Sequence, residues 1–120
     1  MTTTPATKAL LFAEQIQPGT HITAVGADTP HKQELDSAIF KSADRVVVDS
    51  ISQCAERGDS AHALKQGYIQ QNQLIELGAV ILDPNKGRTN EKQITIADLT
   101  GLATQDICIA ACVVQNYKNI

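Results

Sequence analysis

Three aspartates in the sequence lie at the ends of apolar runs, where a carboxylate could exchange protons with a bound molecule. Asp28 follows the run His21–Ala27, and Asp49 and Asp98 each close a further apolar run. If these runs are parallel strands, their carboxyl ends meet at one edge of a sheet, which is where ligands bind in open α/β sheets. A carboxylate at that edge can act as a general acid or base. We favour capping roles for Asp49 and Asp98. Asp28 is the stronger candidate because the small residues before it leave room for a ligand.

Two cationic side chains could assist such a site, although each has a simpler interpretation. Lys32, four residues after Asp28, could neutralise a phosphate or pair with Glu34. A single loop lysine is more often a solvated charge. Arg88 could bind an anion or a carboxylate, but a surface salt bridge or a loop clamp is at least as good an interpretation. The histidines and cysteines lack the spacing of a metal site, so we expect no metal. They are His21, His31, His62, Cys54, Cys108 and Cys112.

The sequence has no glycine-rich turn for the phosphates of a nucleotide. Neither G-x-G-x-x-G nor a P-loop motif occurs in the 120 residues, and Gly26 stands without the other glycines of such a motif. These turns bind pyrophosphate through backbone N–H groups at the start of a helix. We therefore expect no dinucleotide to be bound by this chain alone.

The elements that must position these residues alternate between strands and helices. Strands are predicted over 21–27, 45–49 and 94–99, and helices over 37–43, 52–55, 60–66, 68–77 and 104–117. Strands separated by helices indicate parallel pairing with crossover connections. The sequence therefore predicts an α/β fold of one domain over residues 1–120, with a parallel sheet of three to four strands and flanking helices.

Composition and charge exclude several classes of protein. The net charge of −3 and scattered basic residues argue against a nucleic-acid partner. No apolar stretch approaches the roughly 18 residues that span a bilayer, and the amino terminus does not resemble a signal peptide. The odd number of cysteines indicates reduced thiols. We expect a cytoplasmic protein without a membrane partner.

Three groups of segments together resemble the ornithine cyclodeaminase/mu-crystallin family of NAD(P)-dependent proteins. Each motif is weak, but their order and spacing agree over nearly the whole chain. The segments are 2–5, 18–28 and 32–35; then 43–49 with Gln53; then 76–78, 87–89, 94–98 and 100–106. The resemblance implies that the chain corresponds to the second half of a Rossmann domain. Family members are more than twice this length, so the resemblance also implies a truncated chain that lacks an amino-terminal half.

The resemblance assigns roles to six residues. It implies that Asp28 is the catalytic acid/base of cyclodeaminase chemistry, in which the substrate loses ammonia and closes a ring. It implies that NAD or NADP in the parent family is contacted at Lys32, that Val25 and Gly26 line the nicotinamide, and that Thr100 and Gly101 close over the ring. No cofactor is expected on this chain alone.

Three hypotheses remain open for the chain as a whole. It is a fragment of such an enzyme and inactive alone, a stand-alone module that oligomerises, or one chain of an enzyme split over two polypeptides. We expect a homodimer, because the last predicted helix has an apolar side that would lead toward a domain absent from this chain. That side consists of Ile107, Ala110, Ala111 and Val114.

Overall fold

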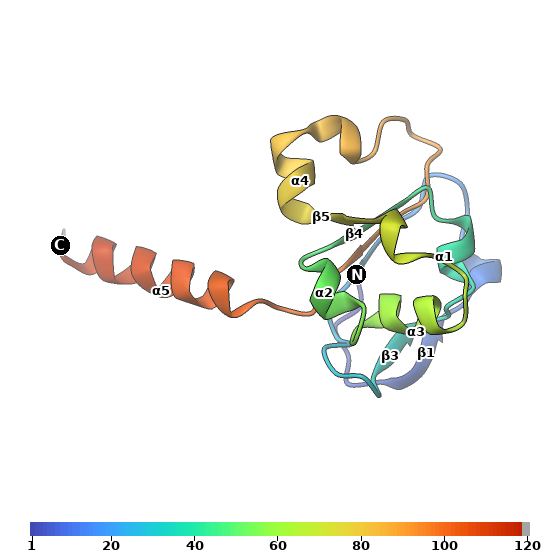
Figure 1. The fold of residues 1–120 in the computed structure, drawn as a ribbon, viewed down its shortest axis with the longest axis horizontal. Helices are drawn as coiled ribbons and strands as arrows, with labels where there is room; N and C mark the ends of the chain where they lie inside the picture. Colours follow the sequence, from blue (N-terminus) through green and yellow to red (C-terminus); the bar gives the residue numbers. More distant parts are fainter. Residues whose placement is uncertain (119–120) are drawn as a thin grey trace.

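The computed structural model describes residues 1–118 and is built on a four-stranded parallel sheet (Figure 1). The strands are β2 (His21–Ala24), β4 (Arg45–Val48), β5 (Leu74–Glu76) and β6 (Thr95–Asp98), in the order β2-β6-β4-β5. The register places Ile96 of β6 between Ile22 and Val46 of its neighbours. The predicted α/β class, the parallel pairing and the three predicted strands are confirmed.

The helices α1 (Ile39–Ser42), α2 (Ile51–Cys54) and α3 (Asp59–Lys65) supply side chains to the core on one face of this sheet. Alternate residues of each strand point to that face, as the pleat requires. Buried aliphatic groups of the strands meet Phe40 of α1, Cys54 of α2 and Ala63 of α3. Three of the predicted helices are therefore confirmed, with ends shifted by one or two residues.

The predicted helix over residues 68–77 is wrong. A short 3-10 turn, η2 (Gln71–Gln73), leads into strand β5, and helix α4 (Leu77–Leu82) begins only where that strand ends. Leu74 points into the core while its backbone pairs with Val46 of β4. Three residues at a sheet edge carry too few apolar positions to distinguish a strand from a helical turn by periodicity.

A second sheet of two parallel strands was not predicted. It pairs β1 (Thr7–Leu11) with β3 (Gln33–Leu35). No residue of β1 is buried, and β3 is three residues long with a glutamate at its centre. Neither segment therefore has the apolar alternation by which strands are recognised. Two further 3-10 turns, η1 (Ala13–Gln15) and η3 (Pro84–Lys86), lie in connections.

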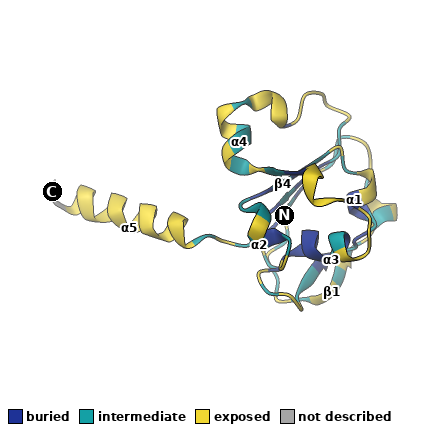
Figure 2. Cartoon of the chain, viewed as in Figure 1, coloured by how far each residue is buried: buried dark blue, intermediate teal, exposed yellow. Residues whose placement is uncertain are grey.

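The last helix, α5 (Ala103–Lys118), projects away from the body of the molecule (Figures 1 and 2). It confirms the helix predicted over 104–117. Every residue from 103 to 117 is exposed, including Ile107 at 66% and Val114 at 53%. The turn before it contains Gly101 with φ of 84°, a left-handed conformation that glycine adopts without strain. Among the described residues, no helix has the length and hydrophobicity needed to cross a membrane.

Candidate functional site at the carboxyl edge of the sheet

The loops that follow β2, β4 and β6 meet at one edge of the sheet, as the sequence predicts. β2 and β6 are neighbours, and the N–H of Leu99 donates to the carbonyl of Ala24 at 2.9 Å, so their loops leave the sheet side by side. Residue Thr2 forms a parallel bridge with Ala24, beside the outer edge of β2. The amino-terminal segment therefore lies next to the loop that carries Asp28.

Asp28 and Lys32 form an ion pair at this edge. Lys32 Nζ donates to Asp28 Oδ1 at 2.7 Å, and the side chains are 26% and 50% exposed for Lys32 and Asp28 respectively. The hydrogen bond from Lys32 holds the pKa of Asp28 below its usual value. Asp28 is therefore ionised at neutral pH and open to solvent, which is the state of a carboxylate that accepts a proton. Lys32 does not pair with Glu34, the alternative considered from the sequence.

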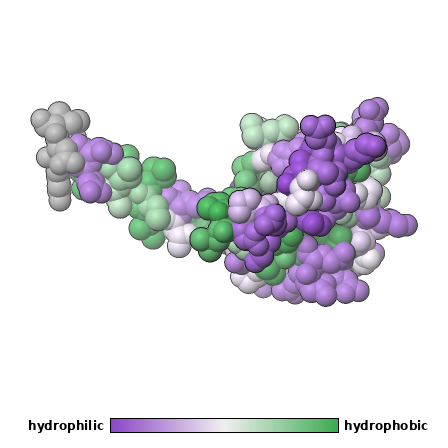
Figure 3. Space-filling model, turned by 90° about the horizontal axis from the view of Figure 1, so that it is seen from above, coloured by the Kyte–Doolittle hydropathy of each residue, from purple (hydrophilic) through white to green (hydrophobic). Residues whose placement is uncertain are grey.

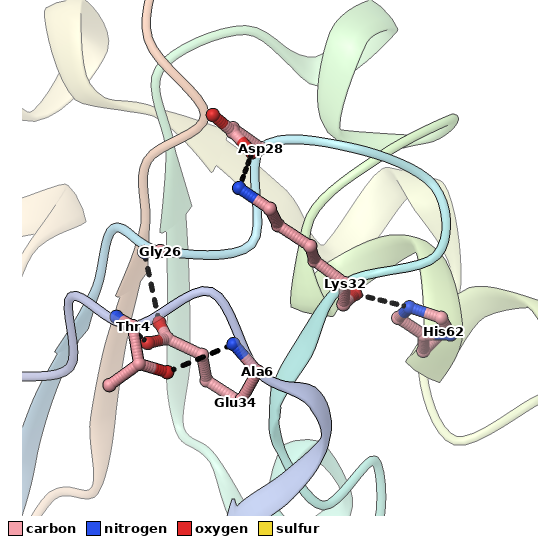
Figure 4. A network of polar contacts seen from close by, with 7 residues as sticks. All are labelled: Thr4, Ala6, Gly26, Asp28, Lys32, Glu34 and His62. Atoms are coloured by element: carbon pink, nitrogen blue, oxygen red, sulfur yellow. Dashed lines mark hydrogen bonds and ion pairs between the residues drawn. The ribbon is translucent and has the colours of Figure 1, made fainter.

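Glu34 holds this edge together through contacts that the sequence interpretation missed. Its buried carboxylate accepts hydrogen bonds from Thr4 N at 2.5 Å and Gly26 N at 2.9 Å (Figure 4). It also accepts one from Thr2 Oγ1 at 2.7 Å. These bonds lower the pKa of Glu34, although burial opposes them. Glu34 thus fastens the amino-terminal segment to the loop that leads to Asp28. No local sequence signal points to this role, because the strand that carries Glu34 was itself not predicted.

Gly26 is a glycine because the chain itself leaves no room for a side chain. A Cβ atom at this position would lie 2.3 Å from Thr4 O and 2.4 Å from Glu34 Oε1. The adjacent Val25 is 40% exposed at the edge. Of the two residues predicted to line a nicotinamide ring, Val25 therefore offers an accessible apolar surface, whereas Gly26 serves the packing of the segment behind it.

The turn at Thr100 and Gly101 is held by the loop after β4. Asp49 Oδ2 accepts from Gly101 N at 2.7 Å, and Gln53 Nε2 donates to Thr100 Oγ1 and to Gly101 O, both at 2.7 Å. Asp49 is thus occupied by a structural role, as favoured from the sequence. A Cβ at Gly101 would meet no atom within 4 Å, so the turn is open on its outer side.

Asp98 is also structural, and it is accompanied by a second buried acid, Asp59. Asp98 Oδ2 accepts from Ser60 N at 2.7 Å, at the start of α3, while Asp59 Oδ1 accepts from the N–H groups of Glu34 and Leu35. Burial raises the pKa of Asp98 to about 7 and that of Asp59 to about 6. Both carboxyl groups are buried inside the protein and are not part of the exposed edge.

Arg88 clamps the loop that carries it to the turn that precedes β2. Its guanidinium donates to the carbonyls of Gly19 and Thr20, each at 3.0 Å, and to Thr95 Oγ1 at 3.2 Å, which is a structural role and not anion binding. These contacts lie at the amino ends of the strands, opposite the candidate site. Within residues 1–118, no cluster of three or more histidine, cysteine or acidic side chains is arranged to hold a metal ion.

The residues at the carboxyl edge fit one part of a nicotinamide dinucleotide. Val25 presents an apolar side chain, the turn at Gly101 is open, and Asp28 and Lys32 supply charged groups beside them. This set suits a flat ring with an adjacent reacting carbon. The pyrophosphate needs a glycine-rich turn at the start of a helix, and the sequence has none.

Comparison with known proteins identifies the family to which this sequence is similar. The model of the ornithine cyclodeaminase/mu-crystallin family matches residues 1–119. An uncharacterised cyclodeaminase of Sinorhizobium fredii is 45% identical over 119 residues, covering 98% of this chain and 36% of its own length. The alanine dehydrogenase of Archaeoglobus fulgidus is 43% identical over 123 residues, covering 100% of this chain and 38% of its own length.

Solved structures agree with the sequence comparison. The iminosuccinate reductase of Paracoccus denitrificans, in complex with NAD+, superimposes with a TM-score of 0.91 at 38% identity, over 98% of this chain and 36% of that one. An archaeal alanine dehydrogenase dimer with bound NAD gives 0.86 at 40% identity, over 98% and 38%. The sheet is therefore Rossmann-like, and the chain spans little more than a third of the length of these relatives. With a family model matched along almost all its residues, this chain belongs to the ornithine cyclodeaminase/mu-crystallin family.

Proposed function

We propose that this chain supplies the proton-transfer edge of an NAD(P)-dependent enzyme that acts on an amino acid or its imine. One observation carries the proposal: Asp28 is ionised, half exposed and held by Lys32 at the carboxyl edge of the sheet. Ligands of open α/β sheets bind at this edge. Asp49 and Asp98, the other acids that end strands, are occupied by internal hydrogen bonds.

The relatives indicate the class of substrate. Their names include alanine dehydrogenase, iminosuccinate reductase and Δ1-pyrroline-2-carboxylate reductase. The substrates in these names share a nitrogen-bearing carbon next to a carboxylate. We extend this class to the present chain, with cyclodeamination of a diamino acid as the branch that Asp28 favours.

Each residue of the edge has a defined task in this proposal. Asp28 accepts a proton from the substrate nitrogen and returns one later, a role that requires the carboxylate to be ionised in the resting state, as its lowered pKa indicates. Lys32 keeps that carboxylate ionised and in place. Val25 and the turn at Thr100 and Gly101 offer the surface against which the nicotinamide ring lies. When bound, the nicotinamide accepts or gives the hydride.

We further propose that the chain is inactive without the remaining two-thirds of the fold, whether that part belongs to the same polypeptide or to another. The test is a chimera in which the amino-terminal part of the Sinorhizobium fredii relative precedes residue 1 of this chain. Ammonia release from ornithine, which involves no net change of the nicotinamide, and absorbance at 340 nm with alanine, iminosuccinate and pyrroline-2-carboxylate should show turnover for the chimera and none for the chain alone. Turnover by the chain alone, or a folded chimera inactive on every substrate, would contradict the proposal.

The second candidate is a stand-alone module that dimerises, and the projecting helix α5 favours it. The structure exposes 7424 Å², about 1,100 Å² more than the roughly 6,300 Å² expected for a folded monomer of its mass. Each partner of a typical stable interface buries about 800 Å². Figure 3 shows hydrophobic residues along α5 and where it leaves the body. Ile107, Ala110, Ala111 and Val114 lie on one side of the helix.

We expect light scattering coupled to size exclusion to give twice the monomer mass of 12.9 kDa. Ile107→Glu places a charge on the apolar side and should return the mass to that of the monomer. Gln105→Glu, on the opposite side of the same helix, serves as the control and should leave the dimer intact. A wild-type mass near 13 kDa at micromolar concentrations would contradict this prediction.

A further inference from the structure

Helix α3 holds the main chain that follows Asp28 through two side chains. His62 Nε2 donates to the carbonyl of Lys32 at 2.8 Å, and Asp59 Oδ1 accepts from the N–H groups of Glu34 at 2.8 Å and Leu35 at 2.9 Å. Asp59 and His62 are three residues apart, so they lie on the same face of the helix. The segment from Lys32 to Leu35 is thus attached to α3 at three backbone atoms.

This attachment matters because Lys32 is the residue that holds Asp28. Between these two residues the backbone bonds are local: Asp28 N donates to Gly26 O and Lys32 N to Thr29 O. A lysine side chain has four flexible methylene groups, so the position of its ammonium group depends on how firmly its backbone is held. Figure 4 shows the sequence of contacts from His62 through Lys32 to Asp28.

We infer that His62 is a positioning residue for Asp28, acting through the carbonyl of Lys32 and the ion pair between Lys32 and Asp28. The consequence for catalysis rests on the role proposed above for Asp28, whereas the mechanical link does not. A carbonyl oxygen can only accept, so Nε2 of His62 carries the hydrogen. His62, which shows no metal-ligand spacing in the sequence, thereby gains a role in the site.

The hydrogen bond from His62 to the carbonyl of Lys32 determines which variants test the inference. The amide nitrogen of a glutamine can occupy the place of Nε2 and donate to the same carbonyl, so His62→Gln preserves the hydrogen bond. His62→Leu fills a similar volume without a donor. His31→Leu is the matched control, because His31 is exposed in the same loop and makes no side-chain hydrogen bond within residues 1–118.

The first test uses the full chain and follows the side-chain carboxyl carbon of Asp28 by NMR as pH is varied. In the wild type the pKa of Asp28 lies below its ordinary value because of Lys32. His62→Leu should raise the pKa of Asp28 toward the ordinary value, since the ammonium group is less often in place. His62→Gln and His31→Leu should leave it at the wild-type position. Amide spectra confirm that each variant is folded.

Two results would overturn the inference: an unchanged Asp28 titration in a folded His62→Leu variant, or equal shifts in the leucine and glutamine variants. If His62→Leu does not fold, a failure of His62→Gln to preserve the wild-type titration decides against it.

The second test transfers these variants to the chimera. There His62→Leu should lower kcat about tenfold, because small displacements of a reacting group are costly, with the glutamine variant close to the wild type. If the titration shifts as expected but Asp28→Asn leaves turnover unchanged, the positioning link stands and the proposed function fails.

Discussion

Replacing Asp28 by asparagine in the chimera should lower kcat by about 100-fold or more, the usual contribution of a general acid or base. Asparagine has nearly the shape of aspartate, and its carbonyl oxygen can still accept the hydrogen bond that Lys32 Nζ gives at 2.7 Å. The variant therefore removes proton transfer while keeping the loop. The affinity for the pyridine nucleotide should change little.

The matched control is Glu56→Gln, the same change of carboxylate to amide at an exposed position between α2 and α3. It should retain the turnover of the parent chimera. If Asp28→Asn also retains that turnover, Asp28 is a structural partner of Lys32 and the proposed role is wrong. A large rise in KM with unchanged kcat would also contradict it, because that pattern reports lost binding and not lost proton transfer.

Asp98 and Asp59 should make the stability of the folded chain depend strongly on pH. Burial raises the pKa of Asp98 from 3.8 to about 7 and that of Asp59 to about 6. Between about pH 4 and pH 7 the folded chain therefore binds more protons than the unfolded chain, so the free energy of unfolding falls as pH rises through this window. We expect the isolated chain to melt at a higher temperature at pH 5 than at pH 8.

Asp98→Asn should remove much of this dependence. The asparagine oxygen can accept the bond from Ser60 N without carrying a buried charge, so the variant should be more stable than the wild type at pH 8, on the order of a few kcal/mol. Near pH 4 the two should differ little. Thermal melts followed by circular dichroism measure this, with the exposed Asp106→Asn as control. A wild type more stable at pH 8 than at pH 5 would contradict the expectation.

The sequence predicts the central part of the fold because its residues are buried in a regular pattern. Val46 and Val48 lie in a strand covered on the core side, and their apolar run is visible without a structure. The strand at Leu74 escaped prediction because only one of its three side chains is buried. Its pairing depends on the neighbouring strand β4, which is information that local periodicity does not contain.

The candidate site was also predicted only in part from the sequence. Asp28 is a candidate on sequence alone because small residues precede it at the end of a predicted strand, whereas a role for Lys32 is implied only by the family resemblance. Glu34 and His62 were missed because their roles are defined by partners 8 and 30 or more residues away along the chain, at Gly26, Thr2 and Lys32. Such contacts follow from the parallel topology, which brings α3 and the amino-terminal segment to the same loop.

The most direct test of the account is a calorimetric titration of the isolated chain with NAD(H) and NADP(H), beside the chimera under the same conditions. We place Asp28, Lys32 and the open turn at Gly101 on this chain, and the pyrophosphate site on the part of the fold that carries a glycine-rich turn. We predict no saturable binding to the isolated chain at micromolar concentrations and binding to the chimera. A micromolar isotherm for the isolated chain would contradict the account.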